Sequence, residues 1–154
     1  MNSSDLQHFL TTHAISAEMV YMQVHTPTVE TAAQALGVHV DQVIKSIVLL
    51  ADESPLLVIA NGTSRIDLKR VADHLNLPRK KIKMADAETV LNITGYIVGS
   101  MPPFGHKTVL RTLIDSRVFD QTLIYGGGGE INAMLKIAPI EIERVTRGVK
   151  VDVV

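Results

Sequence analysis

The stretch Gly95-Tyr96-Ile97-Val98-Gly99-Ser100-Met101-Pro102-Pro103-Phe104-Gly105-His106 breaks the chain with three glycines and two adjacent prolines. Proline fixes its own φ and bars the α region to the residue before it, while glycine adopts backbone shapes that other residues avoid. The stretch therefore predicts a stiff, bent loop. A helical pattern precedes it and an apolar, β-branched run follows it, and binding groups commonly lie on such loops. The alternative is a tight structural turn.

Outward from this loop, the apolar spacing predicts more strands than helices. Expected strands cover residues 19–25, 45–50, 56–60, 81–84, 108–114, 122–125, 134–137 and 149–153. Expected helices run from Ser3 or Ser4 to near His13, from Pro27-Thr28 to Gly37, through 66–75, from Asp86 to Gly95, and from Pro139 through Val145, with one further turn at 40–44. The pattern favours an α+β fold with a mixed, curled β-sheet over a doubly wound parallel sheet. The length indicates one domain, residues 1–154.

Composition excludes several classes of protein. The chain has no Cys, which rules out disulfides, thiolate zinc sites and cysteine nucleophiles. It shows neither a signal peptide nor an apolar run of about 18 residues, so we expect a cytoplasmic protein without a membrane partner. The six histidines lack HxH and HExxH spacing, and no GxSxG, GxxxxGK[ST] or GxGxxG motif occurs. No metal and no cofactor is therefore expected, and an enzyme of this composition would act by positioning and polarising its substrate.

Basic residues are concentrated in one segment of a chain whose net charge is −1. Seven of the fifteen lie between residues 65 and 83, against the two acids Asp67 and Asp73. The seven are Arg65, Lys69, Arg70, Arg79, Lys80, Lys81 and Lys83. Such a patch could meet a phosphate backbone, and the alternative is an ordinary solvated face. Because the whole chain is not basic, we expect no DNA partner.

Lys45 stands inside an apolar run predicted to be a strand. On a strand it shares one face with Ile47 and Leu49, while Ser46 shares the other with Val48 and Leu50. A buried ammonium group needs an anionic partner or a lowered pKa. Lys45 is therefore a candidate for binding an anion, and the alternative is a side chain that snorkels from the strand end.

A second glycine cluster occupies residues 126–129. Successive glycine N–H groups can form a concavity that holds an anion or a developing oxyanion. We expect Gly127 and Gly128 to lie against the reacting bond. The alternative is a loose hairpin tip.

Together these segments resemble the YbaK/prolyl-tRNA-editing deacylase family. The resemblance rests on 43–48 (VIKSIV), 95–106 (GYIVGSMPPFGH), 112–115 (TLID), 24–27 (VHTP), 31–38 (TAAQALGV) and the glycine cluster followed by 138–139 (AP) and 141–146 (EIERVT). It implies a mixed β-barrel core flanked by helices, in a domain that is free-standing or attached to a prolyl-tRNA synthetase. It also implies hydrolysis of amino acids wrongly attached to tRNA, often tRNA for proline, because a synthetase pocket excludes smaller residues poorly.

The resemblance assigns roles to residues of this chain. Lys45 would engage the aminoacyl-tRNA end and, with Gly127 and Gly128, carry catalysis. The substrate would be bound by His25, Ser46, Gly95, Gly99, Ser100, Pro102, Gly105, His106, Asp115, Gly126, Gly129 and Asn132. The seven basic residues, from their clustered charge, are expected to bind tRNA, and the resemblance implies aminoacyl-tRNA as a partner and a prolyl-tRNA synthetase as a candidate partner.

Two positions depart from the family pattern. Gly99-Ser100 stands where relatives commonly carry paired glycines, and Asn132 lies near a position where many carry histidine. Asparagine cannot carry a proton, so the alternative function is a non-catalytic module that binds tRNA ends, nucleotides or a synthetase. A third reading is another small-molecule hydrolase on the same scaffold.

Overall fold

The structure is a computed structural model that describes residues 1–23 and 25–154. Its helices are α1 (Ser3–Thr12), α2 (Val29–Leu36), α3 (Leu68–Leu75), α4 (Ala87–Thr94) and α5 (Pro139–Thr146). Its strands are β1 (Ala17–Tyr21), β2 (Ile44–Ala51), β3 (Ser54–Asn61), β4 (Ile82–Met84), β5 (Arg111–Asp115), β6 (Ile124–Gly127), β7 (Ala133–Ile137) and β8 (Val149–Val151). Short 3-10 turns cover Val40–Gln42, Arg79–Lys81 and Ser116–Asp120.

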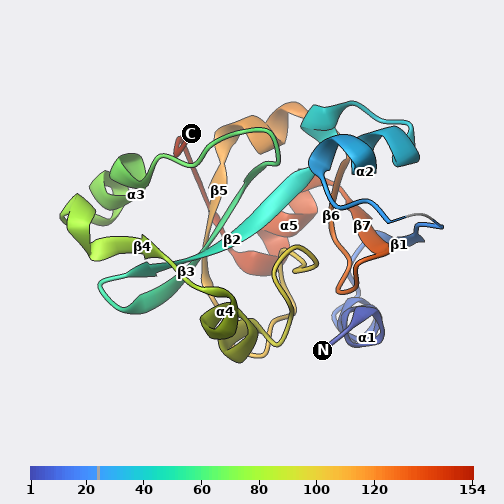
Figure 1. Ribbon diagram of the computed structural model, residues 1–154, viewed down its shortest axis with the longest axis horizontal. Coiled ribbons are helices and arrows are strands. Elements are labelled where there is room, and N and C mark those ends of the chain that lie inside the picture. Colours follow the sequence, from blue (N-terminus) through green and yellow to red (C-terminus); the bar gives the residue numbers. More distant parts are fainter. Residues whose placement is uncertain (24) are drawn as a thin grey trace.

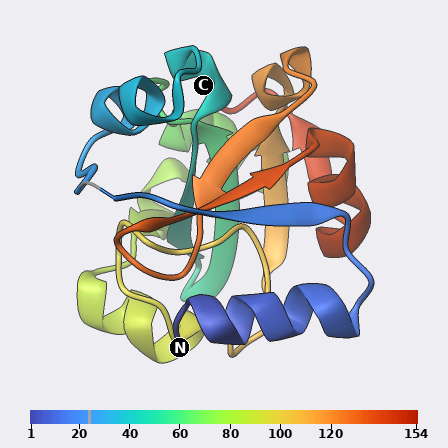
Figure 2. The same ribbon diagram turned by 90° about the vertical axis from the view of Figure 1, so that its right-hand side faces the viewer.

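The strands form two sheets (Figures 1 and 2). The larger has the order β4-β2-β3-β5-β8, in which β2 pairs antiparallel with β3 and β4, while β5 pairs parallel with β3 and β8. The smaller has the order β1-β7-β6 and is antiparallel. Within the described ranges the backbones of the two sheets pair at a single parallel bridge, Val43 to Tyr125, and the sheets do not close into a barrel. The expected α+β fold with a mixed sheet is thus confirmed, and the barrel that the resemblance implies remains open.

Two apolar clusters fill the fold. One lies between the sheets and includes Ile44 and Val48 of β2 with Leu135 of β7, and α1 covers it with Leu6 and Leu10. The other packs the opposite face of the larger sheet against α3 and the chain end. Strand β2 is therefore covered on both faces, which explains why residues 43–50 are almost continuously apolar.

Helix ends follow the predicted capping residues in most cases. Thr28 caps α2 and Asp86 caps α4 through their side chains, and Gly37 and Gly95 end these helices in the left-handed region. Helix α1 differs, because the side chain of Asn2 accepts its first amide hydrogen bonds in place of Ser3 or Ser4.

Strand boundaries shift where tertiary contacts take the backbone groups. The strand expected at 108–114 begins at Arg111, because the N–H groups of Lys107 and Thr108 donate to Thr94 and Ile93 at the end of α4. β6 starts later than expected and runs on into Gly127, so half of the glycine cluster is strand and not hairpin tip. β1 ends at Tyr21, and position 24 of the predicted strand 19–25 lies outside the described residues.

Candidate functional site

Lys45 lies on the face of β2 that it shares with Ile47 and Leu49, as the alternation predicts. Its ammonium donates a hydrogen bond to the carbonyl of Ser64, and it forms no ion pair with a carboxylate in the described chain. Burial lowers the pKa of Lys45 below its ordinary value. The structure thus holds a partly desolvated cation that an incoming anion could pair with.

The candidate site begins where β2 and β6 separate. These strands run parallel at the Val43–Tyr125 bridge, and the same offset brings Ile44 opposite Gly126. A Cβ at Gly126 would lie 3.3 Å from the Ile44 side chain, so a larger residue would push the strands apart. Beyond this point the strands diverge, and the facing backbone groups of Ser46 and Gly127 lose the partners that a continuous sheet would give them.

Ser46 presents its backbone to this opening. The hairpin turn at Asp52-Glu53 makes Ala51 and Ser54 a hydrogen-bonded pair, so every second residue of β2 back to Lys45 bonds to β3. The residues between them point their N–H and C=O groups to the other edge, as the bond from Ala85 N–H to the Val48 carbonyl shows. β4 covers that edge only at 49–51, which leaves the N–H and C=O of Ser46 without a strand partner in the described chain.

Gly127 and Gly128 have different surroundings although they are neighbours. The Gly128 N–H donates to the Ala133 carbonyl over 3.0 Å and is therefore not free to meet an oxyanion. Successive amides in a strand point to opposite sides, so the Gly127 N–H points away from β7. A Cβ at Gly127 would lie 2.3 Å from the Met101 carbonyl oxygen, which requires glycine there. Gly127 is thus the candidate donor, and Gly128 serves the hairpin.

A cavity of about 290 Å³ fills the split between the strands, and we call it the edge cavity. Its walls come from the N-terminal end of α2, from β2, from the 98–101 part of the loop and from the β6–β7 hairpin. Its lining comprises Thr26, Pro27, Thr28, Val29, Ala32, Val43, Ile44, Lys45, Ser46, Ile47, Val98, Gly99, Met101, Gly127 and Met134. Lys45 is the one charged residue among them. An apolar cavity with backbone donors and one cation suits a small, uncharged acyl group joined to an anionic chain.

The glycine- and proline-rich loop reaches the cavity through its middle. Gly99 lines it with φ +92°, in the left-handed region, and a Cβ there would meet no atom within 4 Å. Ser100 is buried, and its carbonyl accepts a hydrogen bond of 2.8 Å from the Gly129 N–H. Pro102 is buried, and its carbonyl accepts a 2.7 Å hydrogen bond from His106. The Gly129–Ser100 bond therefore braces the loop against the hairpin, the His106–Pro102 bond braces the loop internally, and Ser100, Pro102 and Gly129 do not line the cavity.

Several predicted binding residues lie away from the edge cavity. Asp115 is fully buried at the end of β5, where its carboxylate accepts from the N–H groups of Val153 and Arg117. Gly95 ends α4, and Gly105 packs near Phe9 of α1. His25 and Asn132 are exposed and do not line the cavity, and His106 lines a different one. These residues belong to the sequence motifs that were expected to bind the substrate. Which positions of those motifs line the same cavity is decided by how strands that are distant in the sequence pair with one another.

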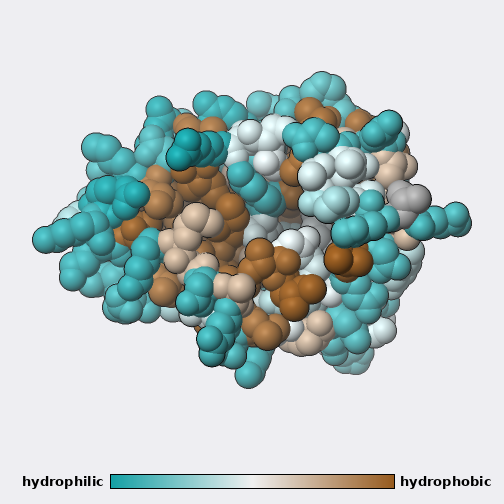
Figure 3. All heavy atoms as spheres, in the orientation of Figure 1, coloured by the Kyte–Doolittle hydropathy of each residue, from teal (hydrophilic) through white to brown (hydrophobic). Residues whose placement is uncertain are grey.

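A wider groove of about 720 Å³ lies on the α3 side of β2, and we call it the basic groove. Figure 3 shows a hollow on this face with hydrophobic residues within it and hydrophilic residues around it. Ile47, Leu49, Ile66, Leu68 and Met84 provide apolar lining, while Lys45, Arg65, Lys69 and Arg79 provide positive charge against the single acid Asp67. The groove shares Lys45 and Ile47 with the edge cavity, so the two spaces adjoin along β2, and the Lys45 ammonium bonds to Ser64, which lines the groove.

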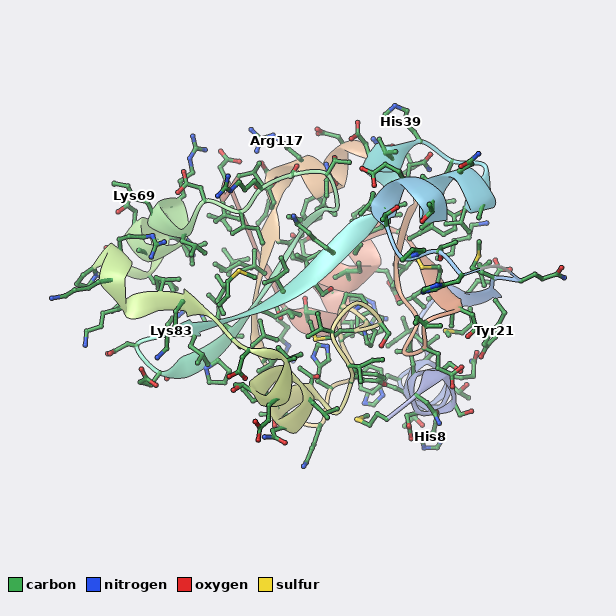
Figure 4. The ribbon with its side chains drawn as sticks, in the orientation of Figure 1. His8, Tyr21, His39, Lys69, Lys83 and Arg117 are labelled. Carbon is green, nitrogen blue, oxygen red and sulfur yellow. The ribbon has the colours of Figure 1, made fainter. Side chains whose placement is uncertain are left out.

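The seven residues of the predicted basic patch are all exposed. Figure 4 shows two of them, Lys69 on α3 and Lys83 on β4, at the same end of the molecule. Four are paired with acids: Lys69 with Asp73, Arg70 with Asp67, Lys81 with Asp52 and Lys83 with Glu53. Arg65, Arg79 and Lys80 have no acidic partner in the described chain and are the charges most available to a ligand.

Sequence reasoning missed three features of this site. The Ser64 carbonyl that accepts from Lys45, and the Thr26 and Met134 walls of the cavity, have no local signal in the sequence. In the described parts of the chain, no three His, Asp or Glu side chains gather as metal ligands would. Nor is any helix there long and apolar enough to cross a membrane.

Comparison with known proteins shows which family the sequence matches. The sequence model of the family described as "Aminoacyl-tRNA editing domain" matches residues 23–145. The uncharacterized protein YwhH of Bacillus subtilis is 24% identical over 126 residues, which cover 81% of this chain and 78% of YwhH. The proline–tRNA ligase of Limosilactobacillus fermentum is 30% identical over 118 residues, 71% of this chain but only 20% of the ligase.

Solved structures give the same result for the fold. A crystal structure described as that of a proposed trans-editing enzyme for prolyl tRNA synthetase superposes with a TM-score of 0.91 at 28% identity. The superposition covers 98% of this chain and 95% of the other. A hypothetical protein of known structure superposes with a TM-score of 0.89 at 27% identity, covering 97% and 98%.

Proposed function

Because this chain belongs to the family of aminoacyl-tRNA editing domains, we propose that it hydrolyses the ester of mischarged aminoacyl-tRNA and holds a small amino acid in the edge cavity. The observation that carries the proposal is the split between β2 and β6. Gly127, Ser46 and Lys45 all line the cavity at this split, and in the described chain the Gly127 N–H and the Ser46 edge have no strand partner across it. Similarity to proline–tRNA ligases and to a proposed trans-editing enzyme supports tRNA for proline as the carrier.

The reaction needs little from the protein because an aminoacyl ester is already activated. A water oxygen bonds to the ester carbon, the bond from that carbon to the ribose oxygen breaks, and a proton from the water ends on the ribose oxygen. The carbonyl oxygen gains negative charge on the way, and the Gly127 N–H is oriented to stabilise it. The substrate's neighbouring ribose hydroxyl is the group available to orient the water.

Lys45 is proposed to contact the RNA next to the reacting ester. Lys45 lines both spaces and its ammonium bonds to Ser64 of the basic groove, so it can pair with a phosphate or ribose oxygen of the terminal nucleotide. The groove then receives the single-stranded end, with bases over its apolar lining and phosphates near Arg65 and Arg79. An anion would also offset the desolvation that lowers the Lys45 pKa.

Hydrolysis of tRNA for proline, charged separately with Ala, Cys, Ser, Thr and Pro, tests the proposal. We expect loss of label from at least one small non-cognate amino acid and retention of proline, measured against the Lys45→Met variant and a no-protein control. Release of none of the five labels would refute hydrolysis of this substrate class. If charged tRNA still bound tightly without turnover, the chain would be the non-catalytic binding module that the exposed Asn132 favours.

A further inference from the structure

A separate cavity of about 390 Å³ lies on the other side of the Gly95–His106 loop, between α1, residues 103–112 and the end of α5. Figure 2 shows the red α5 above the right-hand end of the dark-blue α1, and residues of both elements line the cavity. We call it the α1–α5 cavity. It shares no residue with the edge cavity or the basic groove, and its volume lies within the range of about 300–1,000 Å³ that is usual for small-molecule sites.

Flat apolar rings form part of its wall. Phe9 stacks on His13 with ring centroids 4.1 Å apart and on Phe104 with centroids 5.7 Å apart. Pro103, Leu110 and Val145 complete an apolar lining. A wall of this kind accepts the face of a planar ring.

Two imidazoles in the lining each have one ring nitrogen bound and one free. His106 donates from Nε2 to the Pro102 carbonyl over 2.7 Å, and His13 donates from Nδ1 to the Phe9 carbonyl over 3.0 Å. Because a carbonyl can only accept, the bonded nitrogen of each ring carries a proton, and in the neutral ring the other nitrogen, His106 Nδ1 or His13 Nε2, is an acceptor. Neither acceptor has a protein partner in the described chain. Burial lowers the pKa of His106, which keeps that ring neutral near pH 7.

The charge of the lining is entirely positive. Arg144 and Arg147 stand at the end of α5, and no Asp or Glu lines the cavity. Arg144 is paired with Glu141, whereas Arg147 has no acidic partner in the described residues. Arg147 also holds a left-handed backbone with φ 52°, a conformation that a non-glycine residue adopts with strain. The free guanidinium suits an anionic group at the mouth of the cavity.

We propose that the α1–α5 cavity binds a nucleoside monophosphate unit. Its base would pack against the accessible parts of the Phe9 and His13 rings and donate from an N–H to His106 Nδ1, and its phosphate would pair with Arg147. A simple aromatic acid supplies the ring and the charge but not the N–H donor. This site is distinct from the proposed ester-hydrolysing site and does not depend on it.

Methyl NMR of the intact chain with adenosine 5′-monophosphate as the probe tests the proposal. We expect saturable shifts of the Val109 and Val145 methyls, with a dissociation constant of their own that differs from that of any shift at Ile66 of the basic groove or Met134 of the edge cavity. Adenosine and inorganic phosphate should each bind at least about fivefold more weakly than the nucleotide, since each lacks one half of the contacts. Shifts confined to Ile66 or Met134, equal affinity for phosphate alone, or no saturation up to about 10 mM would overturn the proposal.

Arg147→Gly is the decisive variant because glycine accepts the left-handed backbone without strain, so the fold is not at risk. It should weaken nucleotide binding by about fivefold or more. Lys150→Ala, which removes one exposed positive charge outside the lining of this cavity, should leave this binding unchanged. Equal weakening in both variants would mean a general charge effect and would contradict the site.

Competition identifies the source of the nucleotide. If the natural ligand is a nucleotide within RNA, uncharged tRNA should displace the labelled monophosphate and bind Arg147→Gly more weakly than the wild type. If it is a free nucleotide, tRNA should leave the label bound. Both results support the site, and displacement by tRNA with full affinity for Arg147→Gly would contradict it.

Discussion

The edge cavity and the basic groove share Lys45, but different kinds of polar group line them. The edge cavity combines a few hydroxyl side chains with backbone groups that the sheets hold in place, namely the unpaired edge of β2 at Ser46 and the amide of Gly127. The groove owes its polarity to long charged side chains over an apolar lining. Backbone groups are fixed by the sheets and can be aimed at one atom, whereas long side chains adapt to a varied polyanion. The difference predicts that changes in the cavity affect rate and changes in the groove affect binding.

The largest effect is expected for Gly127→Ala. The methyl group would lie 2.3 Å from the Met101 carbonyl oxygen, so loop and strand must separate. Losing one aligned donor costs on the order of 3 kcal/mol, or about a hundredfold in the single-turnover rate. The melting temperature should also fall, because the obstacle is backbone and cannot rotate away.

Gly128→Ala is the matched comparison for that variant. Its methyl would lie 2.5 Å from the Ala133 carbonyl carbon, so it should also lower the melting temperature. At a temperature where both variants are folded, the single-turnover rate separates them, because only Gly127 points its N–H at the cavity. Equal losses of rate in the two variants would contradict the assignment of the Gly127 N–H, and not the Gly128 N–H, as the donor to the oxyanion.

Lys45→Met is expected to lower deacylation by about tenfold to a hundredfold, the range for a lost charged hydrogen bond. Its melting temperature at pH 7 should stay the same or rise, because burial already disfavours the ammonium and methionine fills a similar volume. Kinetics and melting on the same preparation check both parts. A well-folded variant with normal turnover would exclude Lys45 from the site.

For substitutions in the basic patch around the groove, we expect a smaller effect, which changes tRNA binding and not the rate of hydrolysis. Reversing Arg65 and Lys80 to Glu should weaken tRNA binding and reduce the slope of log affinity against log salt by about one to two units. The matched control reverses Lys69 and Lys83, which are already paired with Asp73 and Glu53 and should matter less. Titrations at several salt concentrations measure both. Unchanged slopes in both pairs would leave the patch as a solvated face.

The smallest effect is expected on the pH dependence of stability, through His106, which bonds to the Pro102 carbonyl within the 95–106 loop. Burial lowers the pKa of His106 below 6.5, so near pH 6 the unfolded chain binds more protons than the folded one. The resulting stability is fully present above pH 6.5 and is lost as the pH falls through the lowered pKa. His106→Gln should lessen the fall in melting temperature between about pH 7.5 and pH 5 by a few degrees. The exposed His74→Gln should leave that fall unchanged, and equal behaviour of the two variants would contradict this assignment.

The sequence by itself determined the elements and the chemical inventory of this protein. Turn and capping residues such as Thr28, Gly37 and Asp86 act within a few residues of themselves, so their effects can be predicted locally. The strand around Lys45 and the rigidity of the 95–106 loop follow from local composition in the same way. The family resemblance rested on these same segments.

Only the tertiary structure decided which of those residues form a site. A single bridge between Val43 and Tyr125 sets where β2 and β6 part, and so frees Ser46 and Gly127 while Gly128 stays bonded within its hairpin. It also turned Asp115 from a predicted binding residue into a buried anchor for the chain end. The physical reason is that a backbone amide carries no side-chain signal. Whether it is free depends on a partner strand some eighty residues away, which the local sequence does not specify.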